Sequence, residues 1–249
     1  MKPDASEPLP PIAGYHPTTL LDWPGRLAAI IFLPRCNLRC RFCHAGPLLA
    51  DSEETIPLED VLAHVASRRG WLDGMVICGG EPTLWPTLPE LCKRLRSAGL
   101  AVKLDTNGTF PDRLAALLDA GLLDAVAMDL KAPLDERYRR ICGAPGMDLA
   151  LVERSLDLLM EGRVEYEFRT TLCPAFIGKD EIRAMGASIA GAACWNLQRF
   201  EPAYAQDPDL RNVAPYGPAE MEALAEIARC HVARCHIRGQ PAEQTVTAR

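Results

Sequence analysis

The sequence predicts an α/β fold, a partial and open (β/α)6 barrel of parallel strands. Short apolar runs recur along the chain, and segments with a helical spacing of apolar residues lie between them. Strands that alternate with helices in this way form parallel sheets through right-handed crossovers. The chain has 249 residues. This length leaves room for about six such units beside a tail, whereas a closed barrel needs about eight units and roughly 250 residues.

The expected strands are short apolar runs, and the first is apolar throughout, which is typical of a strand buried on both faces. The expected strands are 27–33, 75–78, 101–105, 125–130, 164–172, 196–200 and 232–238. Helices are expected near 87–98, 111–120, 148–162, 179–190 and 218–230. The segment before the first strand, 15–26, is expected to be rich in turns.

No interior linker interrupts the pattern, so we expect one domain over 15–239, with an extended or disordered Pro-rich tail at 1–14 and a disordered tail at 240–249. The first 14 residues lack the apolar core of a signal peptide, and no run of 18 apolar residues occurs. We therefore expect a cytoplasmic protein without a membrane partner. A net charge of −6 argues against nucleic-acid binding as the main role.

Ten cysteines in a chain expected in the cytoplasm point to metal ligands, redox groups or buried filler, because structural disulfides are rare there. Cys36, Cys40 and Cys43 follow the first strand with the spacing Cys-x3-Cys-x2-Cys. A 4Fe–4S cluster normally takes four cysteines, so three supplied locally would leave one iron open to a substrate. The alternative is a zinc knuckle that His44 or a distant cysteine completes.

Polar residues also follow the next strand directly, at the edge where parallel α/β sheets carry their chemistry. Gly79 and Gly80 would let a ligand approach the backbone closely. Glu81 beside them could accept a hydrogen bond from an ammonium group. An ordinary tight turn is the alternative interpretation of this segment.

Asp105 and Asp129 end the two strands that come next, and Lys131 lies two residues beyond Asp129. Ionised side chains need water or partners, and a polar cleft provides both. A structural Asp–Lys pair at the barrel rim is the alternative. In the following strand, Arg169 could bind a carboxylate in a bidentate manner or form a salt bridge with a strand glutamate.

The pattern Cys-x3-Cys-x-aromatic-Cys, with Phe42 as the aromatic residue, resembles the signature of radical S-adenosylmethionine (SAM) enzymes, and further motifs follow in that family's order. The resemblance implies a partial barrel of the radical-SAM type. It implies that the three cysteines hold a 4Fe–4S cluster whose fourth iron is chelated by the methionine part of SAM. It also implies that Phe42 belongs to the cofactor site and that Gly79, Gly80 and Glu81 bind the methionine amino group.

Asp105-Thr106-Asn107-Gly108 and Asp129-Leu130-Lys131 are similar to strand ends in activating enzymes of glycyl radical proteins. In that family these residues contact the carboxylate and ribose of SAM, and the aspartates can hold a monovalent cation. The resemblance thus implies that Asp105, Asp129 and Lys131 line the cofactor cleft. SAM has a carboxylate, which Arg169 could bind.

The segment 18–25, TTLLDWPG, resembles one in the activating proteins of anaerobic ribonucleotide reductase, and the likeness spans about 15–239. It implies an oxidoreductase that cleaves SAM reductively to a 5′-deoxyadenosyl radical, with a flavodoxin-like or other low-potential reductant. The implied partner is a glycyl radical protein, anaerobic ribonucleoside-triphosphate reductase. Because the cofactor carries this chemistry, no catalytic side chain is expected. Ala45 stands where the family usually has asparagine, so any local hydrogen bond from that position is expected to be missing.

Two other kinds of function stay open at this point. One is a radical SAM enzyme for a small molecule or a peptide, and the other is a non-catalytic module that binds zinc or an iron–sulfur cluster. The seven remaining cysteines are expected to be mostly inert core residues. These are Cys78, Cys92, Cys142, Cys173, Cys194, Cys230 and Cys235. Cys230-His231 and Cys235-His236 leave a zinc site open, with a helix end followed by a strand as the alternative.

Overall fold

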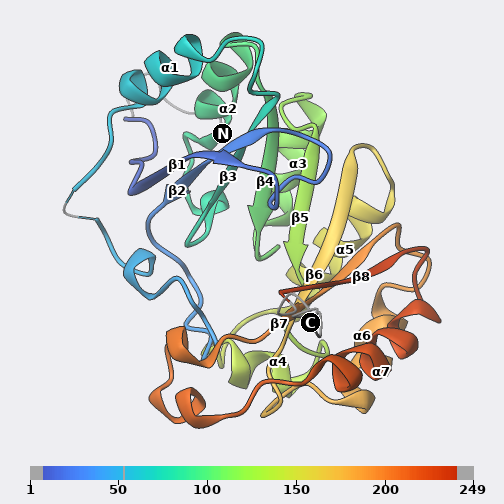
Figure 1. Ribbon diagram of the computed structural model, residues 1–249. Coiled ribbons are helices and arrows are strands. Elements are labelled where there is room, and N and C mark those ends of the chain that lie inside the picture. The colour runs from blue at the N-terminus through green and yellow to red at the C-terminus, as the bar shows by residue number, and fades with distance from the viewer. Residues whose placement is uncertain (1–7, 53, 240–249) are drawn as a thin grey trace, which may run out of the picture.

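The computed structural model describes residues 8–52 and 54–239, and one eight-stranded sheet forms its centre (Figure 1). The strands lie in the sheet in the order in which they occur in the chain. β1 is antiparallel to β2, and β2 to β8 are parallel. The strands are β1 (Gly14–Thr19), β2 (Ala28–Leu33), β3 (Gly74–Gly79), β4 (Ala101–Thr106), β5 (Ala125–Asp129), β6 (Glu165–Leu172), β7 (Trp195–Arg199) and β8 (Cys235–Arg238).

A helix follows each strand from β2 to β7, which confirms the six predicted βα units, and β8 comes last. The helices are α1 (Leu58–Ser67), α2 (Leu88–Ser97), α3 (Pro111–Asp119), α4 (Glu136–Ile141), α5 (Leu149–Met160), α6 (Lys179–Ser188) and α7 (Pro218–Arg229). Within the described part of the chain, β1 and β8 are the two edges of the sheet and do not pair with each other, so the predicted open barrel is confirmed.

Three elements were not expected from the sequence: β1, α1 and α4. β1 contains Pro17 and lacks an alternating apolar pattern, and its pairing with β2 defines it as a strand. α1 buries only Val61 and Val65. α4 has six residues, four of them charged, and begins where the Asp135 side chain accepts a hydrogen bond from the backbone of the second helical residue. Tertiary contacts, rather than local pattern, account for these elements.

Residues 8–14 belong to the segment predicted as a tail, and the structure packs them against the domain. Ile12 is 2% exposed and forms an isolated bridge with Ile56. The Ala13 amide donates a hydrogen bond to the Phe32 carbonyl at 2.8 Å. This part of the segment is therefore extended and docked. Residues 1–7 and 240–249 lie outside the described residues.

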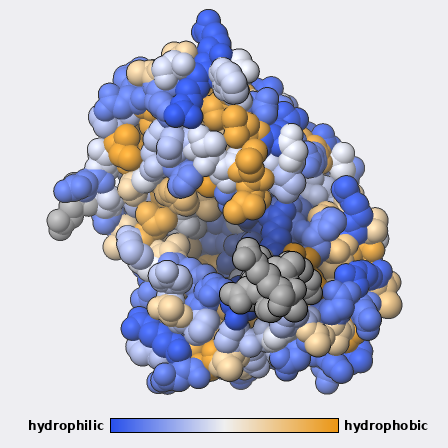
Figure 2. Space-filling view, in the orientation of Figure 1, coloured by the Kyte–Doolittle hydropathy of each residue, from blue (hydrophilic) through white to orange (hydrophobic). Residues whose placement is uncertain are grey.

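The two faces of the sheet are packed differently. The larger apolar core lies between the sheet and the helices. A smaller group inside the barrel joins Trp23 to Ala28, Ile30 and Val76 near the amino ends of the strands. Elsewhere the barrel interior is polar, and Figure 2 shows hydrophilic side chains in the hollow on the face turned to the viewer. No helix in the described ranges is long and apolar enough to cross a membrane.

A buried charged group joins β4, β6 and β8 inside the barrel. Lys103 Nζ lies 3.2 Å from Glu167 Oε1 and donates to the Asp22 carbonyl at 2.5 Å. The second oxygen of Glu167 lies 2.9 Å from Arg238 Nη2. Burial alone would raise the pKa of Glu167, but the neighbouring cations outweigh it and lower the pKa. The group therefore ties the turn before β2 to the second half of the sheet.

Replacing Lys103 with methionine is expected to lower the free energy of unfolding by about 3 kcal/mol, because removing one member of a buried ion pair leaves a charge without its partner. The matched control is Lys93→Met, which removes a lysine of an exposed pair on α2; this change is expected to have no measurable effect. Urea-induced unfolding measures both. Equal stability of the two variants would contradict the importance of the buried group.

Candidate active site

A cavity opens at the carboxyl ends of the parallel strands, between the loop after β2 and the ends of β3 to β7. Ten of the eleven predicted site residues line it: Cys36, Cys40, Phe42, Cys43, Gly79, Gly80, Asp105, Asp129, Lys131 and Arg169. The exception is Glu81. The cavity is also lined by residues that were not predicted as site residues, among them His44, Asn107 and Gln198. The expectation that strand ends bring these polar groups together is therefore correct.

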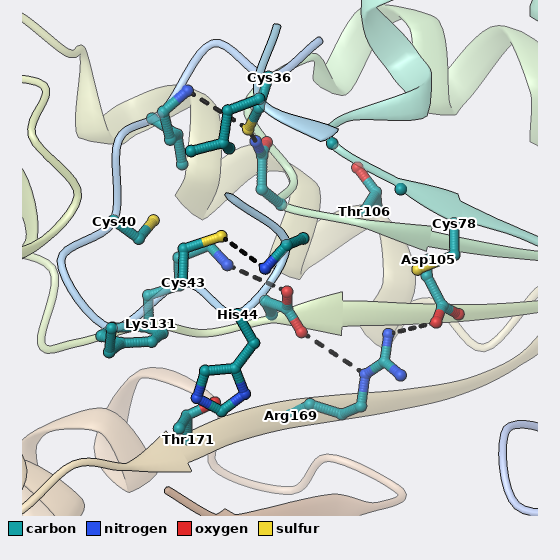
Figure 3. Close-up of a pocket in the computed structure, with 18 of the residues that line it drawn as sticks. Cys36, Cys40, Cys43, His44, Cys78, Asp105, Thr106, Lys131, Arg169 and Thr171 are labelled. Atoms are coloured by element: carbon teal, nitrogen blue, oxygen red, sulfur yellow. Dashed lines mark hydrogen bonds and ion pairs between the residues drawn. The ribbon is translucent and has the colours of Figure 1, made fainter. Parts of the chain in front are cut away.

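The three cysteines of the loop face one cavity without converging on one point (Figure 3). In the described ranges, no group of three or more His, Cys, Asp or Glu side chains is close enough to hold a single metal ion. Three separated thiols around one space suit a polynuclear cluster, which needs a ligand for each of several metal atoms, better than a zinc knuckle. Cys230, Cys235 and their neighbouring histidines likewise do not form a group that could hold a metal ion.

Backbone amides support two of the cysteine sulfurs. The Leu38 amide donates to Cys36 Sγ, and the Ala45 amide donates to Cys43 Sγ, both at 3.4 Å. The expectation that Ala45 leaves this position without a local hydrogen bond is therefore wrong, because its main chain provides one. Hydrogen bonds of this kind favour the charged form of the sulfur.

The loop backbone lies directly against Gly79 and Gly80. A Cβ on Gly79 would lie 2.1 Å from the Leu33 carbonyl oxygen, and one on Gly80 would lie 2.0 Å from that of Arg35. Arg35 itself has a φ of 68°, which is strained for a residue with a side chain. Glycine is thus required at both positions because the backbone of residues 33–35 packs against them. The sequence had suggested only that a ligand approaches these glycines.

Glu81 is fully buried and connects β3 to β4. Its Oε1 accepts hydrogen bonds from the Thr83 amide at 3.0 Å and from Thr106 Oγ1 at 2.7 Å. Its Oε2 accepts one from the Asn107 amide at 2.6 Å. A bond from this carboxylate to a cofactor ammonium group stays a prediction. The carboxylate is directed to the protein interior, and the backbone of the two preceding glycines faces the cavity instead.

The comparisons with known proteins agree with this geometry. The model of the family described as "Radical SAM superfamily" matches residues 30–182. The chain belongs to the radical SAM superfamily. Membership implies a 4Fe–4S cluster and the binding of SAM. The matched range contains the cysteine loop and every strand end that contributes a predicted site residue.

One relative extends over nearly the whole chain. It is a protein of Methanocaldococcus jannaschii with the name "Putative glycyl-radical enzyme activating enzyme", 28% identical over 231 residues, which are 91% of this chain and 95% of that protein. Two solved structures share the fold. SuiB of Streptococcus suis bound to its precursor peptide has a TM-score of 0.65 at 13% identity, over 84% of this chain and 48% of SuiB. TYW1 with a lysine–pyruvate adduct has a TM-score of 0.60 at 20% identity, over 82% and 74%.

A chain of alternating charges crosses the radical SAM cavity from β5 to β4. Lys131 Nζ lies 3.0 Å from Asp129 Oδ2, and Arg169 lies 3.5 Å from Asp129 Oδ1 and 2.7 Å from Asp105 Oδ2. Burial would raise the pKa of Asp129, but the two cations outweigh it and lower the pKa. For Asp105, burial prevails and raises the pKa. Both aspartates are thus paired with cations of the chain itself, and a bound monovalent cation stays a prediction.

The structure does not pair Arg169 with a strand glutamate, and a bond from Arg169 to the carboxylate of SAM stays a prediction. Its guanidinium binds two aspartates at the cavity wall instead of a strand glutamate, and this pairing already satisfies part of its hydrogen-bonding capacity. The second carboxylate oxygen of Asp105 is buried and has no partner among the residues that the structure describes. A ligand hydroxyl or amine that reaches this oxygen would supply the missing hydrogen bond.

Asn107 is a residue whose role the sequence did not indicate, since Asn-Gly commonly marks only a turn. Its side chain donates to Asn37 Oδ1 at 2.9 Å and approaches Cys36 Sγ at 4.0 Å. Its side-chain oxygen accepts from Thr109 Oγ1 at 2.7 Å. Asn107 therefore connects the end of β4 to the cysteine loop. The signal for this role was the motif Asp105-Thr106-Asn107-Gly108, because a simple turn does not require a particular side chain before the glycine.

Replacing Gly80 with alanine is expected to displace the cysteine loop, because the new Cβ would overlap the Arg35 carbonyl. We expect the free energy of unfolding to fall by about 3 kcal/mol and iron uptake on anaerobic reconstitution to fall with it. Gly146→Ala is the control, since a Cβ there meets nothing within 4 Å. Thermal unfolding and iron content report the two effects, and an unchanged iron content in the Gly80 variant would contradict the argument.

Cys40 is expected to ionise at lower pH than Cys36 in the metal-free protein. A hydrogen bond with the Cys142 thiol lowers the pKa of Cys40, although burial opposes it. Burial raises the pKa of Cys36 to about 11. Alkylation by a small haloacetamide as a function of pH, followed cysteine by cysteine by mass spectrometry, measures the order. A lower midpoint for Cys36 would contradict it.

Proposed function

We propose that this radical SAM protein activates a glycyl radical enzyme and that its partner is anaerobic ribonucleoside-triphosphate reductase. The observation that carries the proposal is the match to the Methanocaldococcus jannaschii relative, which extends over 95% of that protein. The radical SAM family model alone fits enzymes with many substrates. A likeness over nearly the full length of both chains favours a shared kind of substrate.

The cavity residues have definite parts in this proposal. Cys36, Cys40 and Cys43 hold the cluster, and the backbone at Gly79 and Gly80 receives the amino group of SAM. The bound cluster and SAM together supply a hydrogen-abstracting radical through one-electron reductive cleavage. The protein binds, orients and excludes water around them. A flavodoxin-like or other low-potential protein is the proposed electron donor.

The charged residues of the cavity wall orient the rest of the cofactor. Asp105, Asp129 and Lys131 offer hydrogen-bonding groups to the ribose and the carboxylate of SAM. Lys131 Nζ also lies 6.0 Å from the centre of the Phe42 ring. Phe42 is also buried in the apolar core, so its ring is held beside Cys43. Arg169 holds both aspartates in place, so it acts on the cofactor through them.

The rim of the cavity suits a protein segment as substrate. Tyr204 is 69% exposed on the turn after β7, and its ring centre lies 6.3 Å from that of His44, which lines the cavity. The ring centre of the buried Phe200 lies 5.9 Å from that of the same histidine. Burial lowers the pKa of His44, which favours the neutral ring. An uncharged aromatic rim with an exposed tyrosine is typical of surfaces that bind polypeptide.

The choice of ribonucleotide reductase depends on the segment 18–25, which does not touch the cavity. Trp23 of this segment packs against Ala28 and Val76 at the amino ends of the strands, and the Asp22 carbonyl accepts from Lys103. The segment closes the end of the barrel opposite the cysteine loop. The segment therefore supports this partner through its resemblance to the activating proteins. It gives no support through contact with a substrate in the cavity.

The function is tested by anaerobic reconstitution with iron and sulfide, reduction with SAM present, and addition of anaerobic ribonucleoside-triphosphate reductase. We expect 5′-deoxyadenosine and methionine in equal amounts, together with a glycyl radical signal in electron paramagnetic resonance (EPR). Cys43→Ala is expected to abolish both, and Cys92→Ala, which changes a buried cysteine on α2, is expected to retain both.

The outcomes separate the proposal from its alternatives. Cleavage of SAM without a glycyl radical on the reductase would contradict this partner and favour a small molecule or another peptide as substrate. An iron-loaded protein that does not cleave SAM would contradict an enzymatic function. Zinc without iron in the purified protein would favour a binding module.

A further inference from the structure

α4 lies against the cysteine loop on the side of Cys40. The Arg39 amide donates to the Cys142 carbonyl at 2.8 Å, and the Arg41 amide donates to the Ile141 carbonyl at 3.0 Å. These two bonds flank Cys40 on either side. A Cβ on Gly143 would lie 2.7 Å from the Arg39 carbonyl oxygen. The end of α4 and the middle of the cysteine loop are therefore held in direct contact.

Two buried donors of this helix lie behind Cys40. The Cys142 thiol is fully buried and does not line the cavity. It lies close enough to the Cys40 thiol for each of them to shift the pKa of the other. Tyr138, one helical turn earlier, is also fully buried. Its hydroxyl has no hydrogen-bond partner among the described residues. Cys142, Lys131 and Cys40 are all close enough to influence the pKa of this hydroxyl.

The unpartnered hydroxyl is informative because buried donors without partners are rare and costly. The Tyr138 hydroxyl has no acceptor among the described residues, whereas the cysteine loop carries sulfurs that become strong acceptors once they are thiolates. A thiolate at Cys40 would change the surroundings of both Cys142 and Tyr138. The Cys142 thiol would become a donor to a charged acceptor, and the Tyr138 hydroxyl would gain an acceptor in its vicinity.

We infer that Cys142 and Tyr138 are positioning residues that donate hydrogen bonds toward the Cys40 side of the cluster and raise its reduction potential. The inference rests on ligation of the cluster by the three cysteines of the loop, as proposed above, but not on the identity of the partner protein. It gives α4 a role that neither the superfamily nor the cavity lining assigns to it.

The direction of the effect follows from charge. Reduction adds an electron to the cluster and increases the negative charge on the sulfur atoms around it. A hydrogen-bond donor stabilises the more negative state more strongly, so each donor shifts the potential upward. A cluster with a higher reduction potential can be reduced by a weaker reductant. All three cysteine ligands have Lys131 nearby, and Cys40 also has Cys142 behind it.

The experiment is an EPR-monitored redox titration of the reconstituted protein without any partner protein. Cys142→Ala and Tyr138→Phe each remove one donor, and both are expected to shift the midpoint potential to more negative values. Cys142→Ser retains a shorter donor and is expected to lie between the parent protein and Cys142→Ala. Cys92→Ala removes a buried thiol far along the chain on α2 and is expected to leave the potential unchanged.

Coincident potentials for Cys142→Ala, Tyr138→Phe and Cys92→Ala would overturn the inference. A shift for only one of the two positions would support that residue and overturn the role of the other. Because EPR detects only clusters that are present, a variant that loads less iron still reports its potential. The titration needs no reductase, so failure of the proposed partner assignment leaves this result intact and is distinguishable from it.

Discussion

The backbone of residues 33–35 runs so close to Gly79 and Gly80 that neither position has room for a Cβ, and the cysteine loop is placed by this contact. Two main-chain bonds close it: the Gly80 amide donates to the Leu33 carbonyl at 2.9 Å, and the Glu81 amide donates to the Arg35 carbonyl at 2.7 Å. Arg35 adopts a strained backbone conformation at the same point. Its side chain pairs with Asp51 and stacks on Trp85, which offsets the strain.

Glu81, which follows these glycines, connects this contact to the end of the neighbouring strand β4. Its carboxylate accepts hydrogen bonds from Thr106 and Asn107 at the end of β4, so the ends of β2, β3 and β4 are joined by hydrogen bonds. The second half of the cavity wall is held by charge instead. Lys131, Asp129, Arg169 and Asp105 alternate in sign, so each buried charge has an opposite neighbour and the group is neutral as a whole. A cofactor that enters this cavity meets a wall that is already fixed.

Much of the site could be predicted from the sequence because parallel strands deliver their carboxyl ends to one edge. Cys36, Asp105 and Asp129 need only that rule to be placed together. The direction of a side chain does not follow from the rule, and Glu81 shows this: its position in the motif was recognised, but its carboxylate is directed inward. The need for Gly79 was likewise attributed to a ligand, because a sequence does not show which backbone lies 2.1 Å from a missing Cβ.

α4 was not predicted from the sequence, yet it contacts the cysteine loop of the site. Its buried side chains, Tyr138 and Ile141, are too few for a periodic pattern, and its existence depends on the loop that it supports. That loop in turn has its first and last cysteines stabilised by local amides, at Leu38 and Ala45, which the loop provides by its own folding. The pKa of Cys40 is instead lowered by the thiol of Cys142, about a hundred residues away in sequence. The three sulfurs are therefore chemically unequal before any metal binds, and the inequality comes from the tertiary fold.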